Sequence, residues 1–156
     1  MLHFAYGSNM DRAIMRRHAP VARAIGVASL PNHHFIITAA GYASVAPVRG
    51  GTVHGVLWKL TPRDRVALDL WENVWGGQYR AEMLPMIMSD GRRALSLVYV
   101  ARRNAVGYPK AGYMELVLAA AAAWRLPPAY MTSLRRWLPM RPRGSGSRKL
   151  KEFGWT

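Results

Sequence analysis

The chain opens with the stretch Leu2-His3-Phe4-Ala5-Tyr6-Gly7-Ser8-Asn9-Met10, a short apolar run that stops at a glycine. The run predicts a buried strand, and the Gly-Ser-Asn step predicts a sharp loop. A helix is expected directly afterwards, over residues 11–18. Backbone amides at such a turn can hold a carboxylate, or the oxygen that becomes negative during acyl transfer. The alternative is that Gly7 only permits the turn while Ser8 or Asn9 caps the helix.

Short apolar segments separated by turn residues continue beyond this helix. They predict extended segments over residues 21–30, 35–40, 41–47, 53–60, 78–88 and 93–101. Gly50-Gly51 predicts a turn before the fourth segment, and Asp90-Gly91 predicts a hairpin between the last two. Helices are predicted over residues 113–124 and 127–138. The chain is therefore expected to form an α+β fold, with a small mixed, curled or barrel-like β-sheet and helices packed on it.

One further helix is predicted between the strands, and its start is well marked. Thr61 is the expected N-cap, Pro62 takes the first helical position, and Asp64 follows three residues after the cap. This pattern is a close variant of the capping box. The helix is expected to run to Glu72, and Gly76-Gly77 ends the helical region.

Glu72 is the carboxylate that the sequence singles out, because it lies among Trp71, Val74 and Trp75. Burial in an apolar pocket disfavours an ionised carboxylate and brings its pKa toward neutrality, where the group can both accept and donate a proton. Glu72 is therefore a candidate general acid/base. The alternative is a solvated glutamate at a helix end.

Length and composition indicate one globular domain. The chain has 156 residues, of which 51% are hydrophobic, and it has no cysteine, which excludes disulfides, thiolate metal sites and a cysteine nucleophile. We expect a single domain over residues 1–138 and a basic, flexible tail over residues 139–156. The N-terminus does not resemble a signal peptide, and no apolar stretch is long enough to span a membrane, so a cytoplasmic protein is expected.

The charge of the chain is strongly positive, with 22 Lys and Arg against eight Asp and Glu. Such an excess raises the possibility of a nucleic-acid partner. However, seven of these cations lie between Arg135 and Lys151, in a segment that is also rich in Pro, Gly and Ser. A solvated terminus is the favoured interpretation, and binding of nucleic acid or another anionic partner through the tail is the alternative.

Several motifs occur together in an order that resembles the gamma-glutamylcyclotransferase-like family. They are Phe4-Ala5-Tyr6-Gly7-Ser8-Asn9-Met10, Gly55-Val56-Leu57-Trp58, Leu68-Asp69-x-x-Glu72, Pro109 with Tyr113, and Leu126-Pro127-Pro128-Ala129-Tyr130. The resemblance covers residues 3–132. The asparagine at position 9 is similar to the branch that acts on gamma-glutamyl amino acids or amines. Asn73 departs from the family, which often has glycine directly after its catalytic glutamate.

The resemblance implies an enzyme that needs no metal and no cofactor. The substrate is a small gamma-glutamyl compound, whose alpha-amine attacks its own side-chain amide to form 5-oxoproline and expel an amine. Glu72 is implied as the general acid/base. The implied substrate-binding residues are Phe4, Ala5, Tyr6, Gly7, Ser8, Asn9 and Tyr113, with the Tyr113 hydroxyl closing the pocket.

Other interpretations compete with this one. The chain could be a catalytically inactive member of the family that binds nucleic acid or an anionic surface, or an enzyme that hydrolyses or transfers the gamma-glutamyl group. Ser8 is not expected to be a nucleophile, because no histidine forms a recognisable triad motif with it. The adjacent His33 and His34 point to opposite faces of a strand and do not predict a metal site. Most of the tryptophans, Trp58, Trp71, Trp75, Trp124 and Trp137, are expected to pack helices and strands together.

Overall fold

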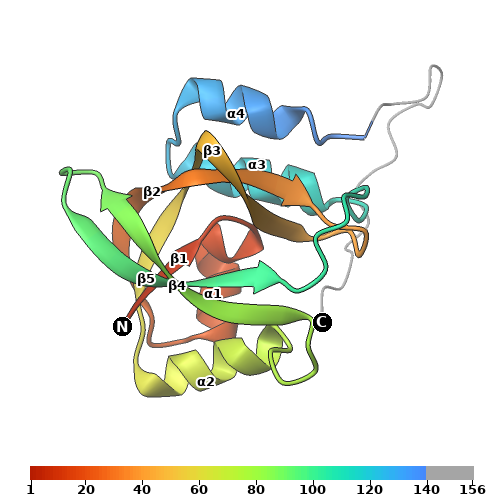
Figure 1. The fold of residues 1–156 in the computed structure, drawn as a ribbon. Coiled ribbons are helices and arrows are strands. Elements are labelled where there is room, and N and C mark those ends of the chain that lie inside the picture. Colours follow the sequence, from red (N-terminus) through yellow and green to blue (C-terminus); the bar gives the residue numbers. More distant parts are fainter. Residues whose placement is uncertain (140–156) are drawn as a thin grey trace.

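A closed β-barrel forms the centre of the protein, in a computed structural model that describes residues 1–139. Five strands follow one another around the barrel in the order β1-β3-β2-β4-β5 (Figure 1). They are β1 (Leu2–Ala5), β2 (Arg23–Ile37), β3 (Ala43–Lys59), β4 (Tyr79–Met88) and β5 (Arg93–Ala101). Neighbouring strands are antiparallel except β1 and β5, which are parallel and pair His3 with Leu97. The expected α+β fold with a barrel-like mixed sheet is confirmed.

Strands β2 and β3 differ from the sequence prediction, because each is longer than the short segments expected. Gly50-Gly51 lies inside β3, so the predicted turn at this position is wrong. The pairing of β2 with β3 shifts register between Pro31 and His33, and the Gly50 amide donates to Asn32 Oδ1 across this irregularity at 3.1 Å. A bulge of this kind bends a strand without ending it, and the glycines therefore belong to a bend in a continuous strand.

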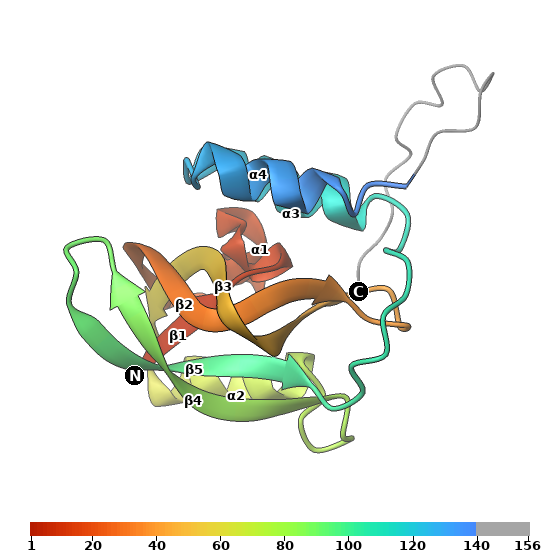
Figure 2. The same cartoon turned by 45° about the horizontal axis from the view of Figure 1, so that its top comes forward.

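The helices pack on two opposite sides of the barrel. The structure contains η1 (Ser8–Met10), α1 (Arg12–His18), α2 (Pro62–Trp71), α3 (Tyr113–Ala123) and α4 (Pro128–Arg135). Figures 1 and 2 show α3 and α4 on one side and α2 on the other. Helix α4 is shorter than predicted and ends at Arg135. None of the helices within residues 1–139 is long and apolar enough to cross a membrane.

The predicted start of α2 is confirmed in atomic detail. Thr61 Oγ1 accepts from the Asp64 amide at 3.2 Å, and Asp64 Oδ2 accepts from the Thr61 amide at 3.0 Å and from the Thr61 hydroxyl at 2.8 Å. These reciprocal bonds are the capping box. The helix ends with Trp71, so that Glu72 is its C-cap residue.

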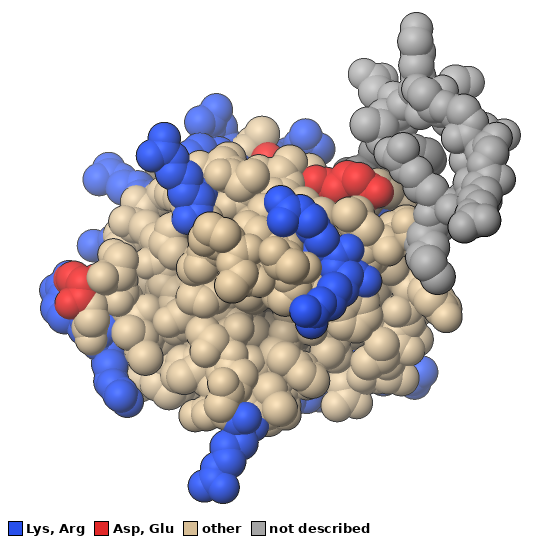
Figure 3. All heavy atoms as spheres, turned by 90° about the horizontal axis from the view of Figure 1, so that it is seen from above, with Lys and Arg blue, Asp and Glu red and all other residues tan. Residues whose placement is uncertain are grey.

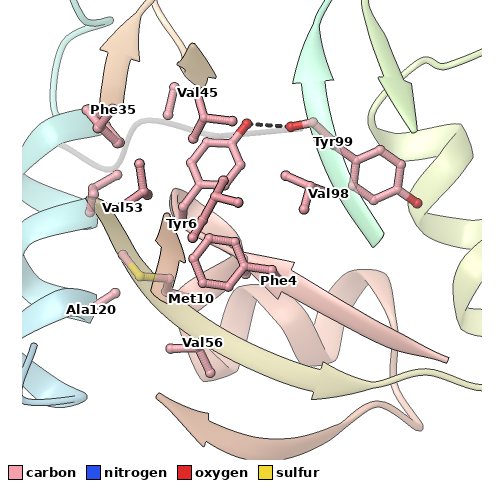
Figure 4. Packing of buried hydrophobic residues seen from close by; sticks show 14 of the residues in the cluster. Phe4, Tyr6, Met10, Phe35, Val45, Val53, Val56, Val98, Tyr99 and Ala120 are labelled. Atoms are coloured by element: carbon pink, nitrogen blue, oxygen red, sulfur yellow. Dashed lines mark hydrogen bonds between the residues drawn. The ribbon is translucent and has the colours of Figure 1, made fainter. Parts of the chain in front are cut away.

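The hydrophobic core fixes the end of β1, and with it the loop that follows. Phe4 and Met10, on either side of the loop, are both fully buried. Tyr6 lies between them in sequence, and its hydroxyl donates to the Tyr99 carbonyl oxygen at 2.5 Å (Figure 4). The Trp124 indole donates to the Met10 carbonyl oxygen at 2.7 Å. The loop is therefore held at both ends by buried side chains.

Two further expectations have different outcomes. The packing role expected of the tryptophans is correct for Trp58, which is 4% exposed. It is wrong for Trp71 and Trp75, which are 39% and 83% exposed. The chain turns sharply after α2, and as a result Val74, and not Trp75, packs against the core. The basic tail predicted over residues 139–156 lies outside the described residues, apart from Pro139 at its start.

Candidate active site

A pocket of about 1070 Å³ opens where the end of β1 meets the ends of α1 and α2 and the start of α3. All the predicted site residues border it, and they come from three separate regions of the chain. They are Phe4, Ala5, Tyr6, Gly7, Ser8, Asn9, Glu72 and Tyr113. Phe4 and Ala5 also belong to the hydrophobic core, so the pocket lies directly against the core.

Glu72 and Asn9 meet inside this pocket although they are 63 residues apart. The Asn9 side-chain amide donates from Nδ2 to Glu72 Oε1 at 3.1 Å. Asn9 is only 6% exposed and lies in η1, so its amide is held in place by the core residues on either side. The loop after β1 and the end of α2 therefore face each other across one cavity.

The pKa of the Glu72 carboxyl is raised to about 7, because burial removes water that would stabilise its charge. The hydrogen bond from Asn9 acts in the opposite direction and favours the ionised form. The residue as a whole is partly exposed at the helix end, so the desolvation concerns the carboxyl group within the pocket. Trp75 points into solvent, so the expected contribution of that side chain is wrong; Trp71 borders the pocket instead. A carboxyl with this pKa can exchange protons at neutral pH.

Gly7 lies close to the Tyr113 hydroxyl, which leaves no room for a side chain at position 7. A Cβ atom on Gly7 would lie 2.7 Å from the Tyr113 hydroxyl oxygen, which is too close for any side chain. That oxygen accepts from the Ala43 amide at 3.3 Å and also interacts with Ser8. Burial raises the pKa of the Tyr113 hydroxyl to about 12, so it stays protonated at neutral pH. The hydroxyl can therefore serve as a hydrogen-bond donor to a bound ligand.

Besides Tyr42, which precedes β3, two strand tyrosines of the pocket wall escaped the sequence analysis. Tyr79 donates its hydroxyl hydrogen to the Ala43 carbonyl oxygen at 2.8 Å, and Tyr99 donates to Asp69 Oδ1 at 2.6 Å. Burial is the main cause that raises the pKa of each of these hydroxyls above its ordinary value. Both tyrosines lie in strands, where an aromatic residue is ordinary, so no local signal distinguished them from core residues.

Ser8 and the histidines have no catalytic arrangement of the triad type. No hydrogen bond among residues 1–139 joins Ser8 to a histidine. His3 borders the pocket, but its Nδ1 is bonded to the Leu97 carbonyl oxygen at 3.1 Å, and burial lowers its pKa to about 4. Within the same residues, no group of three His, Asp or Glu side chains is placed to hold a metal ion.

Asn73 has a structural explanation that leaves the pocket unchanged. Its φ angle is 50°, in the left-handed region that glycine and asparagine adopt more readily than other residues. Its side chain accepts a hydrogen bond from the Gly76 amide at 3.1 Å and does not border the pocket. Asparagine, like glycine, therefore suits the backbone conformation of this turn, and its side chain adds one hydrogen bond within the turn.

The wall of the pocket beside Glu72 is aromatic and carries one cation. The His18 ring at the end of α1 stacks on Trp71 with ring centroids 3.7 Å apart and an angle of 23° between the planes. Both rings border the pocket, as does Arg17. Burial lowers the pKa of His18, and the neighbouring Arg17 charge lowers it further. Both effects favour the neutral form of the His18 ring, and the permanent positive charge of this wall belongs to Arg17.

Comparison with known proteins agrees with this architecture. A family model described as the AIG2-like family matches residues 52–134, more than half of the chain. A solved structure of a gamma-glutamyl cyclotransferase aligns with a TM-score of 0.84 and 24% identity, over 94% of this chain and 93% of that one. An uncharacterized protein from Homo sapiens aligns with a TM-score of 0.83 and 24% identity, over 94% and 92% of the two chains. An AIG2-like protein from Mus musculus aligns with a TM-score of 0.56 and 18% identity, over 65% and 76%.

The fold is that of the gamma-glutamylcyclotransferase-like proteins, as the sequence motifs indicated. The chain belongs to the AIG2-like family. No curated protein matches it in sequence.

Proposed function

We propose that this protein is a cyclotransferase that acts on gamma-glutamyl amino acids or amines and releases 5-oxoproline and a free amine. The observation that carries the proposal is the position of the Glu72 carboxyl, which lies in the pocket, in contact with Asn9, with a pKa of about 7. Membership of the AIG2-like family and the likeness to a gamma-glutamyl cyclotransferase in fold support it.

Glu72 has the two tasks that cyclisation demands of a base. An ammonium group cannot attack a carbonyl, so the ionised carboxylate first takes a proton from the substrate's alpha-ammonium. The free amine then attacks the side-chain amide carbon, forming the new ring bond between carbon and nitrogen. The protonated carboxyl next gives a proton to the leaving nitrogen as the old bond between carbon and nitrogen breaks. The ring nitrogen then loses its second proton to the expelled amine or to solvent, so that the products are 5-oxoproline and an ammonium ion. General acid/base catalysis of this kind contributes about 10²-fold or more.

The remaining pocket residues are proposed to hold the substrate in its folded conformation. The Tyr113 hydroxyl and the backbone amides around Gly7 and Ser8 lie at the loop, where they would bind the alpha-carboxylate or the developing oxyanion. Phe4, Ala5 and Tyr6 form the inner wall of the pocket. Because the attacking amine and the amide belong to one molecule, fixing their orientation lowers the barrier further.

The experiment that tests the proposal replaces Glu72 with Gln, which keeps the shape of the side chain but removes its proton exchange. We expect release of 5-oxoproline from gamma-glutamyl substrates to fall by about 10²-fold or more, with the fold intact. Glu82→Gln is the matched control, because Glu82 pairs with Arg80 and does not border the pocket. Undiminished turnover by Glu72→Gln would remove Glu72 from the reaction.

Product analysis separates cyclisation from the other chemistry of the same pocket. Cyclisation yields 5-oxoproline and a free amine, hydrolysis yields glutamate, and transfer yields a new amide.

The binding of nucleic acid without catalysis has weaker support: on the face in Figure 3, Lys and Arg side chains stand in groups separated by uncharged surface. Salt-dependent binding of nucleic acid by a chain without cyclotransferase activity would favour that function.

A further inference from the structure

The wall formed by Arg17, His18 and Trp71 has no task in the reaction proposed above, and it borders the same pocket. It consists of two stacked rings and one exposed guanidinium. We call these three residues the α1 wall. A cation beside a flat apolar surface fits a ligand that carries a negative charge next to a nonpolar group.

Arg17 is available for such a ligand. Among residues 1–139 it has no ion pair and no side-chain hydrogen bond, and it is the only Lys or Arg that borders the pocket. The nearest acidic residue in sequence, Asp11, is already used as the N-cap of α1, where its Oδ1 accepts from the Ala13 and Ile14 amides, each at 2.9 Å. The Arg17 charge therefore faces the pocket and solvent without compensation.

The order of groups around Glu72 indicates which part of the substrate reaches this wall. The proposed mechanism requires Glu72 to touch both the alpha-ammonium and the leaving nitrogen. The gamma-glutamyl half would occupy the loop side, where Asn9 and Tyr113 lie. Trp71 directly precedes Glu72 and stacks on His18. A leaving group that starts at Glu72 can therefore lie against this stacked pair, and Arg17 borders the same pocket next to His18 in sequence.

We propose that the α1 wall is the subsite for the leaving group and that Arg17 binds a carboxylate on it. The substrate class is then a gamma-glutamyl amino acid, with the alpha-carboxylate of the leaving amino acid on Arg17 and its side chain against the His18–Trp71 pair. This inference rests on the proposed cyclotransferase function and narrows it. The competing class, a gamma-glutamyl diamine, would carry a cation, for which Glu115 on α3 is the exposed carboxylate of the pocket.

The test measures kcat and KM for 5-oxoproline release from three substrates that differ only in the leaving group. They are gamma-glutamyl-alanine, gamma-glutamyl-alaninamide and gamma-glutamyl-1,4-diaminobutane. For Arg17→Gln we expect KM for gamma-glutamyl-alanine to rise about fivefold, as for the loss of an exposed ion pair, with kcat nearly unchanged. The same variant should leave gamma-glutamyl-alaninamide nearly unaffected, because that substrate has no carboxylate on its leaving group.

Arg16→Gln is the matched control. Arg16 is the preceding residue of the same helix and is also exposed, but it does not border this pocket. We expect it to leave both alanine substrates unchanged. The effect of Arg17→Gln should also shrink in high salt, because mobile ions screen an exposed charge.

Three results would overturn the assignment. Arg17→Gln could slow both alanine substrates equally, which would make Arg17 a structural residue, or it could change neither. A third result is a preference of the wild-type protein for the diamine substrate that Glu115→Gln abolishes, which would assign the leaving group to α3. If the wild-type protein releases 5-oxoproline from none of the three substrates, the proposed function itself is wrong, and the subsite assignment is wrong as a consequence. This outcome differs from the three above, in which 5-oxoproline is released.

Discussion

Helix α2 carries a carboxylate at each end, and the two have opposite surroundings. Asp64, in the first turn, is 2% exposed and accepts from the Thr61 amide, the Thr61 hydroxyl and the Val21 amide. Glu72, after the last turn, accepts one side-chain hydrogen bond from the described part of the chain, from Asn9, and its pKa is raised to about 7. The donors around Asp64 tie its charge to the fold. The single donor to Glu72 within residues 1–139 leaves its proton exchangeable, as the proposed acid/base role requires.

The largest effect expected from the difference between Asp64 and Glu72 is the pH dependence of turnover. Glu72 must be ionised to take a proton from the alpha-ammonium, so activity is lost as pH falls through its pKa of about 7. We expect kcat/KM to fall about tenfold for each pH unit below about 6, or roughly fiftyfold between pH 7 and pH 5. Steady-state rates in a buffer series of constant ionic strength measure this. A profile with its acid limb near pH 4 would place Glu72 among the ordinary solvated glutamates.

Removing the other carboxylate should cost stability and leave the chemistry alone. Asp64→Ala leaves the Thr61 and Val21 amides without their acceptor and removes the capping box. We expect the free energy of unfolding to fall by about 2 kcal/mol, as for a lost cap with unpaired buried donors. Urea denaturation followed by circular dichroism measures it. If Asp64→Ala also shifted the pH dependence of turnover per folded molecule, Asp64 would influence the ionisation of Glu72, and the two ends of α2 would not act independently.

The smallest expected effect comes from the single donor to Glu72. Asn9→Leu removes the hydrogen bond that favours the ionised carboxylate, so the pKa of Glu72 should rise further. A hydrogen bond to a charged group contributes about 1.5 kcal/mol, which moves the acid limb of kcat/KM upward by about one pH unit. Activity at pH 6 then falls about tenfold.

Asn73→Gly is the matched control for Asn9→Leu, because Asn73 adjoins Glu72 in sequence but contacts only its own turn. Its φ of 50° suits glycine, so we expect neither the fold nor the pH profile to change. An Asn9→Leu variant that folds normally and loses activity equally at every pH would show that Asn9 shapes the pocket without acting on the Glu72 proton.

The parts of the fold that the sequence predicted well depend on contacts between near neighbours. The capping box at Thr61 and Asp64 and the turn at Asp90-Gly91 each join residues within a few positions, so local patterns are sufficient to find them. The turn predicted at Gly50-Gly51 failed for the opposite reason. Whether two glycines form a hairpin or a bend inside a strand depends on what pairs with them, and here β2 pairs on both sides of the bend.

The same difference between local and long-range contacts separates the site residues that the sequence identified from those that it missed. The motif resemblance selected Glu72, the residues from Phe4 to Asn9, and Tyr113, and the fold gathers all of them around one pocket. It did not find Tyr79, Tyr99 or the α1 wall, because a tyrosine in a strand or an arginine on a short helix has no distinguishing neighbours in sequence. They border the pocket because strands and helices that are distant in sequence pack together there.

By itself, the sequence determined most strands and helices and the start of α2, because these follow from local backbone preferences. Its resemblance to a family selected the candidate site residues. Only the tertiary structure decided that β1 to β5 close into a barrel and that the loop after β1 meets the end of α2. The contact between this loop and the end of α2 sets the pKa of Glu72. Chain segments that are distant in sequence both exclude water from its carboxyl group and supply the hydrogen bond from Asn9.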